Sequence, residues 1–225
     1  RLRIETGRGR SKILELAGEG VSLSFEEHSV PIAPGLSEDG LHALSLPART
    51  RALLGLGGLP AGGIERRWMR KAGRALGNLV ARLCRGPRAH REKGRGIEDL
   101  VGLGTGSTPA GDDILLGVAA AAWRFAGEGR LRREALEGYL DALGGIAAGA
   151  TTETSLEMLR HARRGAFPEP LLRFVATLAE HPGDARRVER EAVLLARSGG
   201  QSGCDMLAGA MAMACAVAAR REVPA

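Results

Sequence analysis

Aromatic residues are scarce in this chain of 225 residues, which has two tryptophans, one tyrosine and four phenylalanines. A surface that stacks nucleobases on aromatic side chains is therefore not expected. Lysine is also rare, since only Lys12, Lys71 and Lys93 stand among the 32 basic residues. The net charge of +6 thus reflects a general preference for arginine at least as much as a function, and we do not expect nucleic acid as the partner.

Cysteines and long apolar runs are limited as well. Cys84, Cys204 and Cys215 are odd in number and show no CxxC or Cys/His spacing, so the sequence predicts neither a disulfide framework nor a structural zinc site. The longest uncharged apolar run, residues 206–219, has 14 residues, which is too few to span a bilayer and suits a buried helix. Since no signal-peptide pattern is present, we expect a cytoplasmic protein without a membrane segment.

The first sixty residues have a pattern of their own. Val21, Leu23 and Phe25 alternate with polar residues, as in a half-buried strand. Short segments with partial alternation also occur at 12–16 and 29–32, and 41–46 is a further candidate strand. Glycine, serine and proline separate these segments, so the sequence predicts a small β-rich unit in residues 1–60.

The pattern becomes helical from residue 61 onward. Apolar residues recur at spacings of three and four from Ile64 to Leu83, while the other face of this predicted helix carries arginines. Further helices are expected at 109–127, 131–149, 153–164, 168–180, 184–197 and 203–220. We therefore predict an α+β fold, in which the β-rich unit precedes a larger all-helical domain at 61–225.

A glycine-rich run, Gly102–Asp113, is the most distinctive motif. Its sequence GLGTGSTPAGDD contains four glycines and leads into an apolar helix. Thr108 is predicted to cap that helix and Pro109 to be its first residue. A helix start of this kind presents free N–H groups and a positive dipole end, which suit a phosphate or a carboxylate. The run is either a tight structural turn or an anion and metal site.

The motif has a partial second copy near the end of the chain. Residues 203–209 match residues 111–117 as G-x-D-x-L-x-G, and each copy follows a turn rich in glycine, serine or threonine. We expect the two helices to pack as a pseudo-symmetric pair, with Gly117 and Gly209 allowing close approach. Asp113 and Asp205 would then face one shared site. In the structural alternative, both copies serve only helix capping and packing.

The motif also resembles a known family. Gly102–Asp113 is similar to the G-L-G-x-G-x-T-P-x-G-D-D motif of a bacterial family long labelled a domain of unknown function. One member of that family is a subunit of the oxamate carbamoyltransferase of allantoin degradation, a branch of purine catabolism. Residues 152–165 and 202–209 resemble two further blocks of the family, whereas Ser107 stands where a leucine is expected.

The resemblance implies a subunit or relative of a carbamoyltransferase that works with other subunits on a small anion, such as carbamoyl phosphate or an oxamate-like carboxylate. The candidate catalytic residues are Asp112, Asp113 and Asp205. The candidate substrate-binding residues are Gly104, Thr105, Gly106, Ser107, Thr108, Thr152, Ser155, Ser202 and Gly203. Mg²⁺ fits an oxygen-only ligand set, with Asp112 and Asp113 as its candidate ligands, but these carboxylates do not establish a metal site.

Two other functions stay open at this stage. The chain is a non-catalytic scaffold or ligand-sensing subunit if its glycine motifs serve packing alone. In a third hypothesis, the basic segment 64–95 binds duplex DNA, and this binding would weaken steeply with added salt. Cys204 has no histidine nearby in the sequence to act as its base, so we do not expect it to be a nucleophile.

Overall fold

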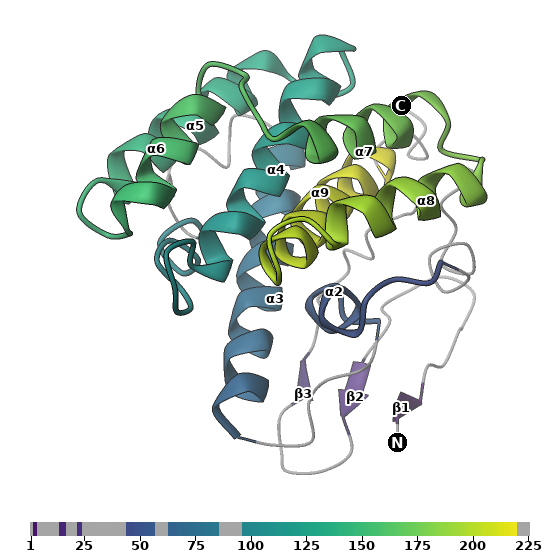
Figure 1. The fold of residues 1–225 in the computed structure, drawn as a ribbon, viewed down its shortest axis with the longest axis horizontal. Coiled ribbons are helices and arrows are strands. Elements are labelled where there is room, and N and C mark those ends of the chain that lie inside the picture. Colours follow the sequence, from purple (N-terminus) through teal and green to yellow (C-terminus); the bar gives the residue numbers. More distant parts are fainter. Residues whose placement is uncertain are drawn as a thin grey trace.

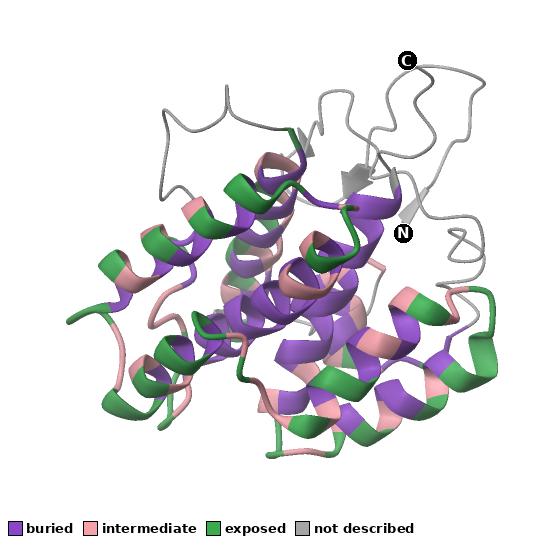
Figure 2. Ribbon diagram, turned by 90° about the horizontal axis from the view of Figure 1, so that it is seen from above, coloured by how far each residue is buried: buried purple, intermediate pink, exposed green. Residues whose placement is uncertain are grey.

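The computed structural model describes residues 2–3, 14–16, 22–23, 44–56, 63–85 and 96–219 (Figure 1). Two long helices, α4 (Ala110–Gly127) and α9 (Ser202–Ala219), form its centre and make the most extensive helix–helix contact among the described elements. Every residue of α4 from Ala110 to Ala122 is buried. Buried positions accordingly concentrate in the middle of the helical assembly (Figure 2).

Shorter helices surround this central pair. α5 (Arg133–Ala147) and α6 (Glu153–Ala162) pack on α4, and α8 (Ala185–Ala196) packs on α9, while α7 (Glu169–Glu180) contacts both central helices. On the other side, α2 (Ala48–Leu53) and α3 (Gly63–Arg85) contact α9. The helices predicted from residue 61 onward are thereby confirmed, with ends that differ by a few residues.

Helix α3 shows why these segments are helical. Its apolar residues fall on one face, so that Ala72, Leu76 and Leu79 are buried in the core. Its opposite face exposes cations, among them Arg67 and Arg74. The basic character predicted for segment 64–95 is therefore that of a solvated helix face as far as residue 85, and residues 86–95 lie outside the described part.

The predicted α+β class is wrong. From residue 44 onward the described residues form helices and turns without a strand. The described strands are β1 (Leu2–Arg3), β2 (Leu14–Leu16) and β3 (Ser22–Leu23), which pair antiparallel in that order but have only two or three residues each. They are shorter than a typical strand of about five residues and do not amount to a β-rich unit.

The physical reason for the error is visible between residues 44 and 53. Leu44 and Leu46 are buried around an exposed Ser45, which imitates strand alternation, yet the N–H of Leu46 donates to the carbonyl of Leu44 at 2.8 Å in a tight turn. Helix α2 follows directly, in a region predicted to be β-rich. The candidate strand at 29–32 lies outside the described residues, and the division at residue 60 stays a prediction.

No helix in the described part of the chain has both the length and the apolar character needed to cross a lipid bilayer.

Candidate functional site

Helices α4 and α9 touch backbone to backbone at two glycines. A Cβ atom at Gly117 would lie 2.0 Å from the carbonyl oxygen of Met206, and a Cβ at Gly209 would lie 2.0 Å from that of Ile114. Only glycine permits such an approach. The prediction that Gly117 and Gly209 allow the two helices to approach each other closely is confirmed.

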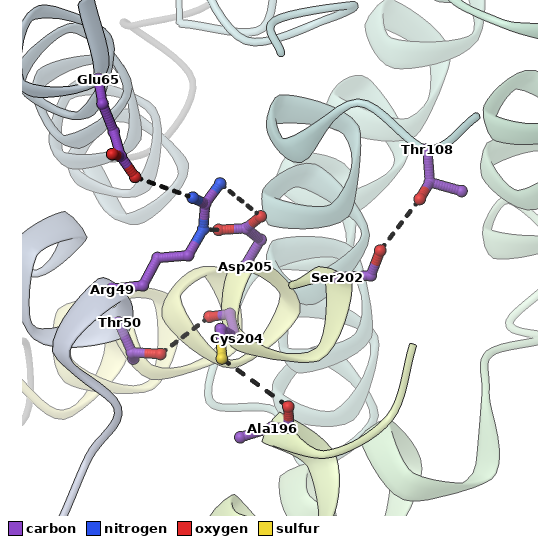
Figure 3. Close-up of polar contacts among 8 residues, drawn as sticks. All are labelled: Arg49, Thr50, Glu65, Thr108, Ala196, Ser202, Cys204 and Asp205. Carbon is purple, nitrogen blue, oxygen red and sulfur yellow. Dashed lines mark hydrogen bonds and ion pairs between the residues drawn. The ribbon is translucent and has the colours of Figure 1, made fainter. Parts of the chain in front are cut away.

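The two helix starts lie together. The side-chain oxygens of Thr108 and Ser202 are 3.0 Å apart and share a hydrogen bond between the glycine-rich loop and the first residue of α9 (Figure 3). Gly111 and Gly203 have equivalent surroundings, since a Cβ on either would lie within 2.0 Å of a carbonyl oxygen in the preceding segment. The loop residues Gly104, Thr105, Gly106 and Ser107 are exposed beside this junction.

The prediction that Thr108 caps α4 is wrong. The N-cap residue is Pro109, and no side chain caps the helix. The carbonyl of Pro109 accepts the N–H groups of Asp112 and Asp113, at 2.9 and 3.2 Å. This arrangement frees the Thr108 hydroxyl to bond across to Ser202.

Asp112 joins the motif to its surroundings. Its Oδ1 atom accepts the N–H of Gly102 at 2.9 Å, and its Oδ2 atom accepts the hydroxyl of Thr151. Gly102 has φ +68°, and a Cβ there would meet the carbonyl oxygen of Ala150 at 2.2 Å. Both carboxylate oxygens of Asp112 are thus used to hold the loop and the turn before α6 in place.

Asp205 is paired with a cation that the sequence did not indicate. Arg49 of α2 donates from Nε to Oδ1 at 2.7 Å and from Nη2 to Oδ2 at 3.0 Å, while Asp205 is only 1% exposed (Figure 3). The guanidinium also lies 4.7 Å from the ring centroid of Trp68 and 3.8 Å from a carboxylate oxygen of Glu65. Burial raises the pKa of Asp205, and the bonds and charge of Arg49 oppose that rise.

Asp113 differs from Asp112 and Asp205 because one of its carboxyl oxygens lacks a hydrogen-bond donor among the described residues. It is 2% exposed, and its buried Oδ2 atom has no hydrogen-bond partner in the described structure. Burial is the largest cause that raises its pKa to about 7, and the charges of Asp205 and Asp112 add to the rise. Hydrogen bonding with the side chains of Ser202 and Thr108 acts in the opposite direction. At neutral pH this carboxyl is therefore poised between its acid and its anion.

The third predicted turn lies next to the loop. Thr152 is the N-cap of α6, where its hydroxyl accepts the N–H of Ser155 at 3.2 Å. The same hydroxyl donates to the carbonyl of Ser107 at 2.5 Å. Ser155 is buried within α6. Thr152 therefore touches the loop, whereas the contacts of Ser155 identify it as part of a helix start; ligand binding by either residue stays a prediction.

Sequence reasoning missed the residues supplied by α2. Arg49 lies 156 positions from Asp205, and neighbouring Thr50 is fully buried and donates to the carbonyl of Cys204 at 3.0 Å. A helix of six residues leaves little periodic signal. The thiol of Cys204 is held next to Asp205, and its pKa is raised mainly by burial, which disfavours a nucleophilic thiolate.

These contacts do not test the prediction that Asp112 and Asp113 bind Mg²⁺. Among the described residues, no group of three or more His, Cys, Asp or Glu side chains is arranged to hold a metal ion. Asp112 and Asp205 already use both of their oxygens.

Taken together, these contacts define a helical protein whose two central helices begin, in pseudo-equivalent fashion, at one polar cluster. The family model described as "Oxamate carbamoyltransferase subunit AllH" matches residues 100–214, about half of the chain. The chain belongs to this family, which supports its role as a subunit of that complex, with the other subunits as partners. Searches of curated proteins and of solved structures found no match.

Proposed function

We propose that this chain binds a small anionic metabolite, carbamoyl phosphate or an oxamate-like carboxylate, where α4 and α9 begin, as a subunit of an oxamate-type carbamoyltransferase. The observation that carries the proposal is the hydrogen bond between Thr108 and Ser202, which brings two helix N-termini to one place. Two positive dipole ends side by side favour negative charge more than one does.

The exposed loop supplies hydrogen-bond donors at this place. Among the described residues, the N–H groups from Gly104 to Thr108 donate to no backbone carbonyl. Gly104 has φ +121° and Gly106 has φ +101°, and a Cβ at Gly104 would lie 2.8 Å from the nitrogen of Ala110. The glycines thus hold a short stretch of free N–H groups against the start of α4, as an anion site requires.

Three aspartates near an anion would repel it unless their charges were compensated. Asp205 is compensated by the bidentate contact with Arg49. Asp113 carries a proton in part at neutral pH, because its pKa is about 7. Asp112 directs both of its oxygens to donors within the protein. The cluster is therefore far less negative than its three carboxyl groups suggest.

Calorimetry with the full-length chain, alone and together with the other subunits, tests the proposal with carbamoyl phosphate, inorganic phosphate and oxamate. We expect binding, and a loss of roughly tenfold or more in affinity for Ser202→Ala, since a hydrogen bond to a charged group contributes about 1.5–3 kcal/mol. Thr154→Ala on the exposed face of α6 is the matched control and should bind normally. If none of the three anions binds with the other subunits present, the proposal is wrong.

A second function, a non-catalytic scaffold or ligand-sensing subunit, is favoured by the packing roles of the motif. Gly111, Gly117, Gly203 and Gly209 each face a backbone carbonyl, which explains much of both motif copies without a ligand. Asp113→Asn and Asp205→Asn separate the two functions. Lost ligand affinity in variants that still fold supports the binding site, whereas wild-type protein that binds none of the anions, together with variants that only lose stability, supports the scaffold.

A further inference from the structure

We propose that one face of α3 docks an acidic surface of another subunit of the carbamoyltransferase complex. Four arginines form this face, which we call the cationic stripe, namely Arg66, Arg67, Arg70 and Arg74. The inference goes beyond the proposed anion site, because it concerns how the chain assembles with its partners. It rests on the charges of α3 and on membership of a family of complex subunits.

The charge of α3 differs from that of the other long helices in the described part of the chain. Its 23 residues include seven that are basic and a single acid, Glu65. In each of the helices α4 to α8, by contrast, acidic residues accompany the arginines. A helix face that only meets water commonly mixes charges of both signs. The imbalance on α3 therefore favours a counter-charge that comes from outside the helix.

The cationic stripe is continuous along one side of α3. Arg66, Arg70 and Arg74 follow one another at intervals of four residues, and Arg67 precedes Arg70 by three. Residues at these spacings are neighbours on a helix surface, so their like charges repel and weaken the helix. An acidic surface that lies along the stripe replaces this repulsion with attraction to each guanidinium.

The arginines of the stripe are available to a partner. Arg67 and Arg74 are exposed, Arg66 and Arg70 are half-buried, and none of the four forms an ion pair with a described residue. The N-terminal part of α3 also projects beyond the central helices α4 and α9 (Figure 1). A flat or concave protein surface can therefore reach the stripe without displacing another helix of the described structure.

The observations favour a protein partner over nucleic acid or a second copy of this chain. Family membership makes other protein subunits the partners, and the stripe has no aromatic side chain free to stack on a base, since Trp68 is covered by Arg49 at 4.7 Å. A second copy would have to supply carboxylates. Exposed ones such as Asp141, Glu157 and Glu180 already pair with arginines of their own chain.

The cationic stripe also borders the polar cluster at the helix starts. Its first two arginines share the first turns of α3 with Glu65 and Trp68, which lie 3.8 Å and 4.7 Å from the guanidinium of Arg49. Arg49 in turn holds Asp205 in the first turn of α9. A subunit docked on the stripe thus contacts the turns of α3 that help to position Arg49.

Calorimetry between the full-length chain and the purified other subunits of the complex tests the inference. The triple variant Arg67→Gln, Arg70→Gln, Arg74→Gln should bind at least about tenfold more weakly, because three ion pairs are lost together. Raising the salt from about 50 to about 300 mM should weaken binding of the wild type more than binding of the variant. The variant should melt at the wild-type temperature or above it, since repulsion along α3 falls.

A second triple variant is the matched control. Arg186→Gln, Arg187→Gln and Arg197→Gln remove the same charge from exposed positions in and directly after α8. This variant should bind the other subunits as the wild type does. Equal losses of binding in the two triple variants would show that net charge matters and the stripe does not, which would overturn the inference.

Arginine labelling with phenylglyoxal, read by mass spectrometry, locates the interface on the wild-type protein. Adding the other subunits should protect Arg67 and Arg74, while Arg186 and Arg187 stay reactive. Unprotected stripe arginines, or other subunits that do not bind the wild type at all, would overturn the inference.

The same proteins test the other occupants of the stripe. Binding of a 20-base-pair DNA duplex that is tighter than binding of the subunits, or dimerisation of the chain alone that the stripe variant abolishes, would overturn the choice of partner. Titrations with carbamoyl phosphate, phosphate and oxamate should give the same affinities for the stripe variant as for the wild type. Failure of the anion site and failure of docking are thereby told apart.

Discussion

Gly117 of α4 and Gly209 of α9 each face the backbone of the opposite helix, and a Cβ on either would come within 2.0 Å of a carbonyl oxygen there. Each glycine lies four residues after an aspartate of the repeated motif, Asp113 in α4 and Asp205 in α9. The two glycines lie about one helical turn from these carboxyl groups. Their contacts therefore set the distance between the helices close to the carboxyl groups. Packing and candidate site are two consequences of one sequence pattern.

Gly117→Ala is expected to destabilise the protein by about 1–3 kcal/mol or more, because the added methyl meets backbone atoms that have no room to yield. Chemical denaturation measures the change in the free energy of unfolding. Gly145→Ala is the control, since a Cβ at this α5 position meets nothing within 4 Å. It should leave stability unchanged or raise it by up to about 1 kcal/mol. Equal effects of the two substitutions would refute the close contact.

Arg49→Met is expected to cost about 3 kcal/mol of unfolding free energy near pH 8, because it leaves the carboxylate of Asp205 buried without its cation. The loss should shrink as the pH falls and Asp205 takes up a proton. Adding Asp205→Asn to Arg49→Met should recover part of the loss, so that a double-mutant cycle gives a coupling between the two residues. Strictly additive effects would show that the ion pair contributes nothing.

The stability of the protein should depend on pH through Asp113, whose pKa is raised to about 7 in the folded state. Its folded pKa exceeds its unfolded value, so the folded state binds the proton more tightly, and this stabilisation is complete below about pH 4 and lost as the pH rises through about 7. Relative to Asp113→Asn, the wild type should lose stability over this window with a slope of at most about 1.4 kcal/mol per pH unit. Parallel curves for the two proteins would contradict the shift.

Asp112→Ala should loosen the glycine-rich loop, because the N–H of Gly102 and the hydroxyl of Thr151 lose their acceptor. We expect a cost of about 1–3 kcal/mol and faster hydrogen exchange at the Gly102 amide. Asp112→Asn keeps an oxygen for Gly102 and should slow that exchange again. Unchanged protection of Gly102 in the alanine variant would show that Asp112 does not anchor the loop.

Most helices and the repeated helix start could be predicted from the sequence, because both depend on local patterns. The apolar spacing from Ile64 to Leu83 predicts α3. The shared G-x-D-x-L-x-G pattern correctly predicts that α4 and α9 pack through Gly117 and Gly209. Information of this kind lies within a few turns of one helix.

The errors and omissions depend on contacts between distant segments. Leu44 and Leu46 alternate with a polar residue because they reach the core from a turn, and alternation alone does not tell a turn from a strand. The partner of Asp205 is one arginine among many, 156 residues away, and no spacing selects it. Among the described residues, the Oδ2 atom of Asp113 has no hydrogen-bond partner, because the donors nearby bond to other acceptors. Only the folded chain shows this, since it depends on which segments lie together.

The most direct test of the account is a titration of the ¹⁵N-labelled full-length chain with oxamate, followed through its backbone amide resonances. If α4 and α9 begin at one anion site, the amides of Gly104, Gly106 and Gly203 should shift together, with a single apparent dissociation constant. Asp113→Asn should alter that constant without altering which amides respond. Shifts at only one of the two helix starts, or at neither, would contradict a shared site.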